Sequence, residues 1–302
     1  MTHDPHRLSS LVRVLVVSMV AVVSMMVALT SPAEATWSIV AADPESAEVG
    51  AAIASCVPVE ILGRVGEPLA PIIVIPGVAI GVTQAQMNLD APARIRELVA
   101  AGATPREIID ELTSPSFDEV ASLRQHAIVR LPSDVAAATG ADNSPEALDQ
   151  VAEGVSVQGN LLVSTAVVDD AMAAFLDAAG ANTDLASALV DGLVAGSAAG
   201  GDRRCGDQTA LFAQLVVAKA GDDPSTPSTL LTVSVDQGDG QNPVALLADA
   251  FLEGRTGVID AGASEPGSGG LVRILVLVVA GLMVVVSLVA LKRGMGSVSA
   301  RR

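Results

Sequence analysis

Two long apolar segments, one near each end, constrain the fold of this 302-residue chain more than any other feature. The first, residues 14–29, follows Arg7 and Arg13 and precedes Ala33-Glu34-Ala35. A basic start, a short apolar run and an Ala-x-Ala site are typical of a secretory signal peptide. At roughly 24 Å as a helix, the run is short for a membrane span. We therefore predict that residues 1–35 are a cleaved signal peptide; an uncleaved N-terminal anchor is the alternative.

The second apolar segment, residues 274–291, precedes a basic tail, residues 292–302. It would make about 27 Å of helix, enough to span a bilayer core, and positive charge marks the cytoplasmic side. We expect a transmembrane helix at 271–291, preceded by a flexible stalk at 255–270. This plan predicts a single-pass protein of the cell membrane, with its body outside the cytoplasm and its tail inside. A bacterial sorting signal, in which an enzyme replaces the helix with another anchor, remains an alternative.

Charge limits the partners of the body. Residues 36–268 contain 10 Lys or Arg and 32 Asp or Glu, a net charge of −22. This balance argues against binding to nucleic acid, which needs basic surface, and against adhesion to an anionic membrane face. About 230 residues are enough for one domain with a full core. The expected partners are the bilayer, through the C-terminal helix, and an unknown small-molecule or peptide substrate.

The body has few of the residues on which catalysis usually depends. His126 is its only histidine, Lys219 its only lysine, and it has no tyrosine. A zinc site would need nearly every histidine and cysteine present, and a serine triad would depend on His126 alone. His126 lies in a strand-like run, which favours a structural role. Export makes a disulfide between Cys56 and Cys205 plausible, but spacing alone leaves their pairing open.

Runs of strand and helix signals predict an α+β fold with antiparallel sheets, because no regular βαβ alternation is present. Strands are expected at 36–42, 49–56, 72–85 with a break at Pro76-Gly77, 125–131, 135–139, 155–158, 209–218 and 230–235. Helices are expected at 91–101, after the Thr104 capping box, at 165–179, at 184–199 and at 243–252, and Ser116–Glu119 carries a weaker start signal.

Cleavage after Ala35 would make Thr36 the first residue of the mature chain. A threonine hydroxyl needs a base to take its proton, and the α-amine of an N-terminal threonine can serve. The pKa of that amine in model peptides is roughly 7.7–8.0, so a useful fraction is neutral near pH 7. Such a site needs no histidine, metal or cofactor. Alternatively, Thr36 only begins a strand, as β-branched residues often do.

An ordered set of motifs resembles an uncharacterised bacterial family of unknown function classed with the N-terminal-nucleophile (Ntn) hydrolases. The motifs are Thr36-Trp-Ser-Ile-Val-Ala41, Asp43-Pro-Glu45, Glu48-Val-Gly50, Ala54-Ser-Cys56, Gly81-Val-Thr-Gln-Ala85 with Asn88, Leu98-Val-Ala-Ala-Gly102, Thr139-Gly140, Val157-Gln-Gly-Asn160, Met172-Ala-Ala-Phe175 and Ala199-Gly-Gly-Asp-Arg203. No single motif is specific, but their order extends over nearly all of residues 36–254.

The resemblance implies a four-layer αββα sandwich of two antiparallel sheets, with the nucleophile at the start of a central strand. It also implies hydrolysis of an amide bond, whose oxyanion needs preorganised donors. Gln158 and Asn160 are the candidate donors, and Gln84 and Asn88 could also donate. The candidate substrate-binding residues are Gln84, Asn88, Asp202 and Arg203. Each could instead satisfy nearby backbone, and Asp202 and Arg203 could pair with each other.

Some relatives place a lysine beside the nucleophile to lower the pKa of the amine. No lysine lies between Thr36 and Ala218, which leaves Arg64 or Arg203 as substitutes. We therefore expect a membrane-anchored, extracytoplasmic Ntn-type hydrolase of residues 36–254, with Thr36 as nucleophile and base. The alternative is a non-catalytic extracellular binding module on the same fold, favoured by the missing lysine and the acidic body. A purely structural surface protein has no specific feature in its favour.

Overall fold

The computed structural model describes residues 36–58, 71–144, 146–181 and 183–262. The expected signal peptide, transmembrane helix and basic tail lie outside these residues, as do Arg64 and residues 263–270 of the expected stalk. Within the described ranges, no helix has the length and apolar character needed to cross a membrane.

The described residues form a mixed α+β fold with two sheets and five α-helices. The strands are β1 (Thr36–Asp43), β2 (Glu48–Ser55), β3 (Ile72–Ile75), β4 (Ala79–Ala85), β5 (Arg124–Arg130), β6 (Asp134–Thr139), β7 (Leu148–Ala152), β8 (Val155–Asn160), β9 (Phe212–Lys219), β10 (Thr229–Ser234) and β11 (Gly257–Asp260). The helices are α3 (Ala91–Ala100), α4 (Pro105–Leu112), α5 (Ala166–Gly180), α6 (Leu185–Ala198) and α7 (Pro243–Leu252), with short 3₁₀ turns at Ala121–Leu123 and Gly206–Gln208.

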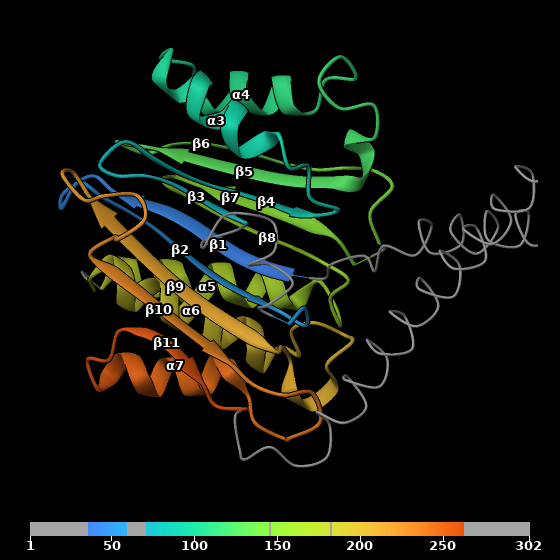
Figure 1. Cartoon of the computed structure of the whole chain (residues 1–302), viewed down its shortest axis with the longest axis vertical. Coiled ribbons are helices and arrows are strands. Elements are labelled where there is room, and N and C mark those ends of the chain that lie inside the picture. The colour runs from blue at the N-terminus through green and yellow to red at the C-terminus, as the bar shows by residue number, and fades with distance from the viewer. Residues whose placement is uncertain (1–35, 59–70, 145, 182, 263–302) are drawn as a thin grey trace, which may run out of the picture. The chain divides into compact units, whose positions relative to one another are not determined.

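The two sheets face each other, and each is covered by helices on its outer side (Figure 1). The larger sheet has the order β11-β10-β9-β2-β1-β8-β7 and the smaller one the order β3-β4-β5-β6. From β10 to β7, and throughout the smaller sheet, neighbouring strands run antiparallel. One apolar core lies between the sheets, a second joins the larger sheet to α5, α6 and α7, and a third joins the smaller sheet to α3 and α4.

The side chains of β1 alternate between two of these cores, because successive residues of a strand point to opposite faces. Trp37, Ile39 and Ala41 pack in the core beneath α5, α6 and α7, and Val40 packs in the core between the sheets. Thr36 lies an even number of residues from Val40. Its side chain therefore faces the space between the sheets, at the end of a central strand.

Two glycines allow α6 to lie close to both β1 and α5. A Cβ at Gly192 would lie 2.5 Å from Cδ1 of Ile39 and 3.0 Å from the carbonyl oxygen of Ala171. A Cβ at Gly196 would lie 2.7 Å from Nε1 of Trp37. Because a helix carbonyl oxygen cannot move aside as a flexible side chain can, a larger residue at Gly192 would force α6 away from α5.

Most of the expected elements form. The predicted hairpin is the β1–β2 pair, and residues 72–85 divide into β3 and β4 on either side of Pro76-Gly77. Thr104 caps α4 through the predicted capping box with Glu107. The last helix has the predicted bounds, Pro243–Leu252.

Three expectations for local structure are corrected. Ser116–Glu119 starts no helix, because Asp118 accepts a hydrogen bond from the Val120 amide at 3.0 Å and turns the chain into β5. β9 begins at Phe212 rather than at 209, because the 3₁₀ turn and a left-handed Thr209 precede it. The edge strands β7 and β11 were not expected, and β11 lies within the segment predicted as stalk.

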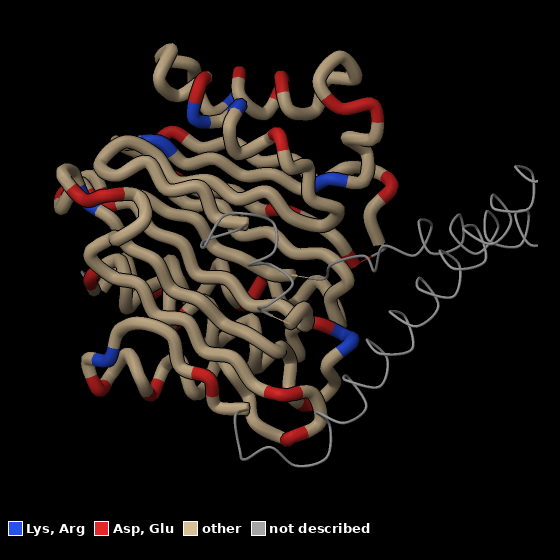
Figure 2. The backbone as a smooth tube through the Cα atoms, in the orientation of Figure 1, with Lys and Arg blue, Asp and Glu red and all other residues tan. Residues whose placement is uncertain are grey.

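The acidic side chains of the described residues lie mainly on helices and on the segments between elements, whereas the strands carry few of them (Figure 2). Most of these charged groups remain solvated, so their abundance does not disturb the cores; among the described residues, Asp118 and Asp202 are buried and hydrogen-bonded.

Candidate functional site

At one end, the space between the sheets is lined by polar side chains rather than by the apolar core. Strand alternation places them there, because each lies on the face of its strand that is turned toward the space between the sheets, as the apolar residues of the intersheet core do. All have 5% or less of their surface exposed. They are Thr36 and Ser38 of β1, Ser55 of β2, Gln84 of β4, Gln125 of β5, and Ser156, Gln158 and Asn160 of β8.

Thr36 lies at the centre of this polar end, in register with Ser55 on one side and with Asn160 on the other. Its hydroxyl donates a hydrogen bond to the Ser55 hydroxyl at 3.2 Å, and Ser55 in turn accepts one from the Val57 amide at 3.2 Å. The Thr36 carbonyl accepts a hydrogen bond from Nε2 of Gln84 at 3.4 Å. The predicted nucleophile is therefore held at both its side chain and its carbonyl.

A side-chain amide has two hydrogens that it can donate. The number already used in hydrogen bonds distinguishes the roles of Gln84, Gln158 and Asn160. Gln84 donates to the Thr36 carbonyl and to Oε1 of Gln125 at 2.6 Å. Gln158 donates to the carbonyl and the hydroxyl of Ser38, at 3.1 and 2.6 Å. Asn160 donates only to Oε1 of Gln125, at 3.2 Å, among the described residues. Asn160 thus keeps one amide hydrogen, whereas Gln84 and Gln158 have none left for an oxyanion.

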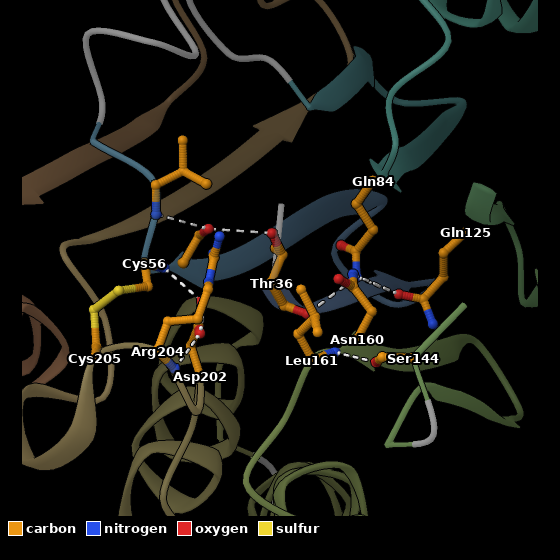
Figure 3. Close-up of polar contacts among 12 residues, drawn as sticks. Thr36, Cys56, Gln84, Gln125, Ser144, Asn160, Leu161, Asp202, Arg204 and Cys205 are labelled. Atoms are coloured by element: carbon orange, nitrogen blue, oxygen red, sulfur yellow. Dashed lines mark hydrogen bonds and ion pairs between the residues drawn. A yellow bond between two sulfur atoms is a disulfide. The ribbon is translucent and has the colours of Figure 1, made fainter. Parts of the chain in front are cut away.

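An ion pair between a buried carboxylate and a partly exposed guanidinium flanks Thr36 on the side away from Gln84 and Asn160 (Figure 3). Asp202 is fully buried and accepts a hydrogen bond from the Cys56 amide at 2.8 Å. It also accepts from the backbone amide and the guanidinium of Arg204, the latter at 2.8 and 3.1 Å. Because Cys56 follows Ser55 directly, Asp202 fixes the strand end that contacts the Thr36 hydroxyl.

The two cysteines, whose pairing the sequence left open, form a disulfide that joins the same two segments. Cys56 lies just after β2, and Cys205 lies in the loop that carries Asp202 and Arg204. The bond links positions 149 residues apart. It therefore holds the loop with the ion pair against the end of β2.

Two of the expected substrate-binding residues have their contacts elsewhere. Arg203 forms an ion pair with Glu146, and its neighbour Arg204 is the arginine that pairs with Asp202. Asn88 donates to Asp118 at 2.8 Å. Burial alone would raise the pKa of the Asp118 carboxyl, but hydrogen bonds from Arg124, Asn88 and the Val120 amide lower it.

Ser55, Gln125 and Arg204 were missed as site residues. Ser55 could have been found from the predicted hairpin, since its register sets Ser55 opposite Thr36. Sequence cannot tell which of two adjacent arginines turns inward. Gln125 comes from the opposite sheet, and no local pattern shows which strands of two sheets face each other.

His126 lies outside the site. It alternates with Gln125 along β5, on the face that carries Ile128 toward α3 and α4. It is 1% exposed, and neither ring nitrogen has a hydrogen-bond partner among the described residues. Burial, aided by the charge of Arg124 and opposed by that of Asp118, lowers its pKa to about 4. A neutral, buried imidazole of this kind is structural.

Two cavities in the described part of the chain are not lined by Thr36. One, of about 470 Å³, lies between the end of α6 and the start of α7, and its polar lining includes Ser197, Thr209 and Asn242. The other, of about 480 Å³, is lined by residues of the 113–122 segment and by Ala138, Thr139 and Gly140. No group of three or more His, Cys, Asp or Glu suited to a metal ion occurs among the described residues.

Comparisons with known proteins match the same region. The model of a family described as "Family of unknown function (DUF1028)" matches residues 36–247, so the match begins at Thr36. No curated protein matches. A crystal structure of protein SPO2555 from Silicibacter pomeroyi, which carries the same family assignment, is similar, with a TM-score of 0.57 and 23% identity over 74% of this chain and 87% of that one. At this identity the likeness concerns the fold.

Proposed function

Since the chain belongs to the family of unknown function DUF1028, we propose a function from its site: an Ntn-type hydrolase that cleaves an amide bond with Thr36 as nucleophile. The observation that carries the proposal is the position of Thr36. It is the first residue of the central strand β1 and of the family match, and it follows an Ala-x-Ala cleavage signal. The pair of facing sheets covered by helices supports an Ntn-like sandwich as the finer description of the fold.

In the proposed reaction, signal-peptide cleavage frees the Thr36 amine, which takes the proton from Oγ1. Oγ1 then attacks the carbonyl carbon of the substrate and forms a tetrahedral oxyanion. The remaining amide hydrogen of Asn160 donates to that oxyanion, and the ammonium gives its proton to the departing amine. Water, deprotonated by the same amine, attacks the resulting threonyl ester. The acyl–Oγ1 bond breaks to release the acid product, and the ammonium returns its proton to Oγ1. Ser55 keeps Oγ1 oriented through the 3.2 Å hydrogen bond.

The Asp202–Arg204 pair has a positioning role in this account. The positive charge of Arg204 is offset by Asp202, with which it makes a two-point ion pair. It is therefore not equivalent to the lysine that other superfamily members place beside their threonine. We expect the amine to act near its ordinary pKa of roughly 7.7–8.0, so that activity rises with pH through this range.

Export and activation would be one event in this proposal. The body would lie outside the cytoplasm, attached to the cell membrane by the segment at 271–291. The Cys56–Cys205 disulfide supports this location, because disulfides persist in oxidising compartments and are rare in the cytosol.

A non-catalytic binding module is the second candidate. The Thr36 side chain is only 5% exposed, and both cavities described above lie away from it. On this reading the protein would retain a ligand unchanged, and Thr36 would serve only to begin β1.

The deciding experiment uses the membrane-anchored protein purified after expression with its own signal sequence. N-terminal sequencing should give Thr36 as the first residue. The protein and its Thr36→Ala and Thr36→Ser variants are then incubated with a panel of N-acyl amino acids and short peptides, and release of free amine is measured. Turnover in the parent protein, reduced in Thr36→Ser and lost in Thr36→Ala, is expected. A different N-terminus, or equal turnover in Thr36→Ala, would exclude the proposal.

A further inference from the structure

Gln125 joins the smaller sheet to strands β7 and β8 of the larger sheet. It is fully buried on β5, opposite the larger sheet. Its Oε1 accepts hydrogen bonds from Gln84 at 2.6 Å and from Asn160 at 3.2 Å. Its Nε2 lies 2.8 Å from Oγ1 of Thr139 and 3.0 Å from each of the carbonyl oxygens of Leu148 and Gly159, so these three acceptors share its two hydrogens. One amide therefore connects β4, β6, β7 and β8.

The partners of Gln125 fix which way its amide faces. A backbone carbonyl can only accept a hydrogen bond, so Nε2 must face Leu148 and Gly159. A flipped amide would set Oε1 against these two carbonyl oxygens and Nε2 against two NH₂ groups. Such an arrangement would leave several buried polar atoms without partners, which is costly. The Oε1 atom therefore always faces Asn160.

The orientation of Asn160 follows from that of Gln125. One hydrogen of its Nδ2 is directed to Oε1 of Gln125, and the second is directed away from Gln125. Gln125 also bonds the Gly159 carbonyl, one residue before Asn160, and reaches the Thr36 carbonyl through Gln84. The same side chain thus restrains the proposed oxyanion donor and, indirectly, the nucleophile.

We propose that Gln125 is a positioning residue of the reaction, which orients the Asn160 amide toward the oxyanion without touching the substrate. The catalytic half of this inference, that Gln125 aids the reaction by orienting Asn160, rests on the proposed function. Its structural half, that Gln125 holds the Asn160 amide, stands independently of any activity.

A double-mutant cycle tests the catalytic half. Gln125→Met keeps the length of the side chain and removes all its hydrogen bonds. We expect it to lower kcat about 10- to 100-fold with little change in KM, which is less than the 10²–10³-fold loss typical of deleting an oxyanion donor. In an Asn160→Ala background, Gln125→Met should lower kcat less than about twofold, because the group it orients is absent. Equal losses in both backgrounds would overturn the proposal, because they indicate general damage to the fold.

Two further variants separate positioning from stability. Gln125→Glu keeps an acceptor for Gln84 and Asn160, so its kcat should exceed that of Gln125→Met. This difference should hold even if the melting temperature of Gln125→Glu is no higher than that of Gln125→Met. Gln214→Met removes another buried glutamine, which lies in the larger sheet and whose Nε2 donates to Oγ1 of Thr232 at 2.8 Å. It should lower the melting temperature and leave kcat within about twofold of the parent protein. A comparable loss of kcat in Gln214→Met would contradict a specific role for Gln125.

The structural half is measured by NMR of the side-chain amides in the mature protein in detergent micelles. One of the two Asn160 amide hydrogens should exchange with solvent more slowly than the other, and Gln125→Met should remove this difference in exchange rate. The amide of Gln158, bonded to Ser38, should be unchanged. An unchanged Asn160 signal in Gln125→Met would overturn the inference. Full turnover in Thr36→Ala would overturn the proposed function instead, and the NMR result would still decide whether Gln125 orients Asn160.

Discussion

The hydroxyl of Thr36 lies 3.2 Å from the hydroxyl of Ser55, its partner in the β1–β2 register. Thr36 begins β1 and Ser55 ends β2, and both side chains face the space between the sheets. Ser55 is fixed from behind, since its hydroxyl accepts the Val57 amide and the next residue, Cys56, is held by Asp202. The orientation of the proposed nucleophile therefore depends on a neighbour that is itself restrained.

Replacing Ser55 tests this dependence. Ser55→Ala should lower kcat about 5-fold, because the Thr36 hydroxyl loses its partner, a bond worth about 1 kcal/mol. Ser46→Ala, in the exposed turn of the same hairpin, is the control and should leave kcat unchanged. Steady-state rates with a cleavable amide give the comparison. Unchanged kcat in Ser55→Ala would show that this contact has no role in the reaction.

Of the described side-chain amides at the polar end that contains Thr36, only Asn160 has an amide hydrogen left. Asn160→Ala should therefore lower kcat by about 10²–10³ and KM only slightly, as for the loss of an oxyanion donor. Asn143→Ala removes an amide that caps the carbonyls of Arg124 and Gly140 instead. That control should affect the melting temperature and not kcat. A KM increase with unchanged kcat in Asn160→Ala would assign Asn160 to substrate binding.

The disulfide between Cys56 and Cys205 should support both stability and activity. Because it closes a long loop, Cys56→Ser with Cys205→Ser should lower the free energy of unfolding by about 2–5 kcal/mol. The loop with Asp202 and Arg204 would also lose its covalent attachment to β2. Urea unfolding monitored by circular dichroism, with kcat measured below the transition, gives both effects. Equal stability of the double variant and the parent protein would contradict this account.

His126 should make stability depend on pH. Its pKa is about 4 in the folded protein and roughly 6.5 when unfolded, so the unfolded chain binds an extra proton between these values. The free energy of unfolding should therefore fall as the pH drops, by about 2 kcal/mol between pH 7 and pH 5 from this group. His126→Leu should lack this part of the slope. Urea titrations of both proteins at pH 7 and pH 5 test this prediction. An equal fall in the free energy of unfolding in His126→Leu and in the parent protein would refute it.

The sequence predicted the parts of the fold that depend on local signals. Strand alternation at 36–42, the turn at Pro76-Gly77 and the capping box at Thr104 led to the elements observed there. β7 was missed because it is a short edge strand with polar Asp149 and Gln150, whose pairing with β8 is not a local property. Ser116–Glu119 was misread because the partner of Asp118 is Arg124, in the next strand.

The candidate site was only partly predictable for the same reason. Thr36 and Asn160 were proposed from motifs that lie near their own strand ends. Gln125 and Arg204 depend on tertiary contacts, since Gln125 comes from the opposite sheet and Arg204 is brought in by the disulfide loop. The hydrogen bonds that leave Gln84 and Gln158 without spare hydrogens also extend between strands or between sheets.

The central claim, that Thr36 is the nucleophile, is tested most directly by mapping a covalent adduct. The mature protein purified from membranes is treated with a β-lactone, digested, and analysed by peptide mass spectrometry. We predict a single acyl adduct on Oγ1 of an N-terminal Thr36, absent from Thr36→Ala and from the uncleaved precursor. An adduct on any other residue, or labelling that persists in Thr36→Ala, would contradict the account.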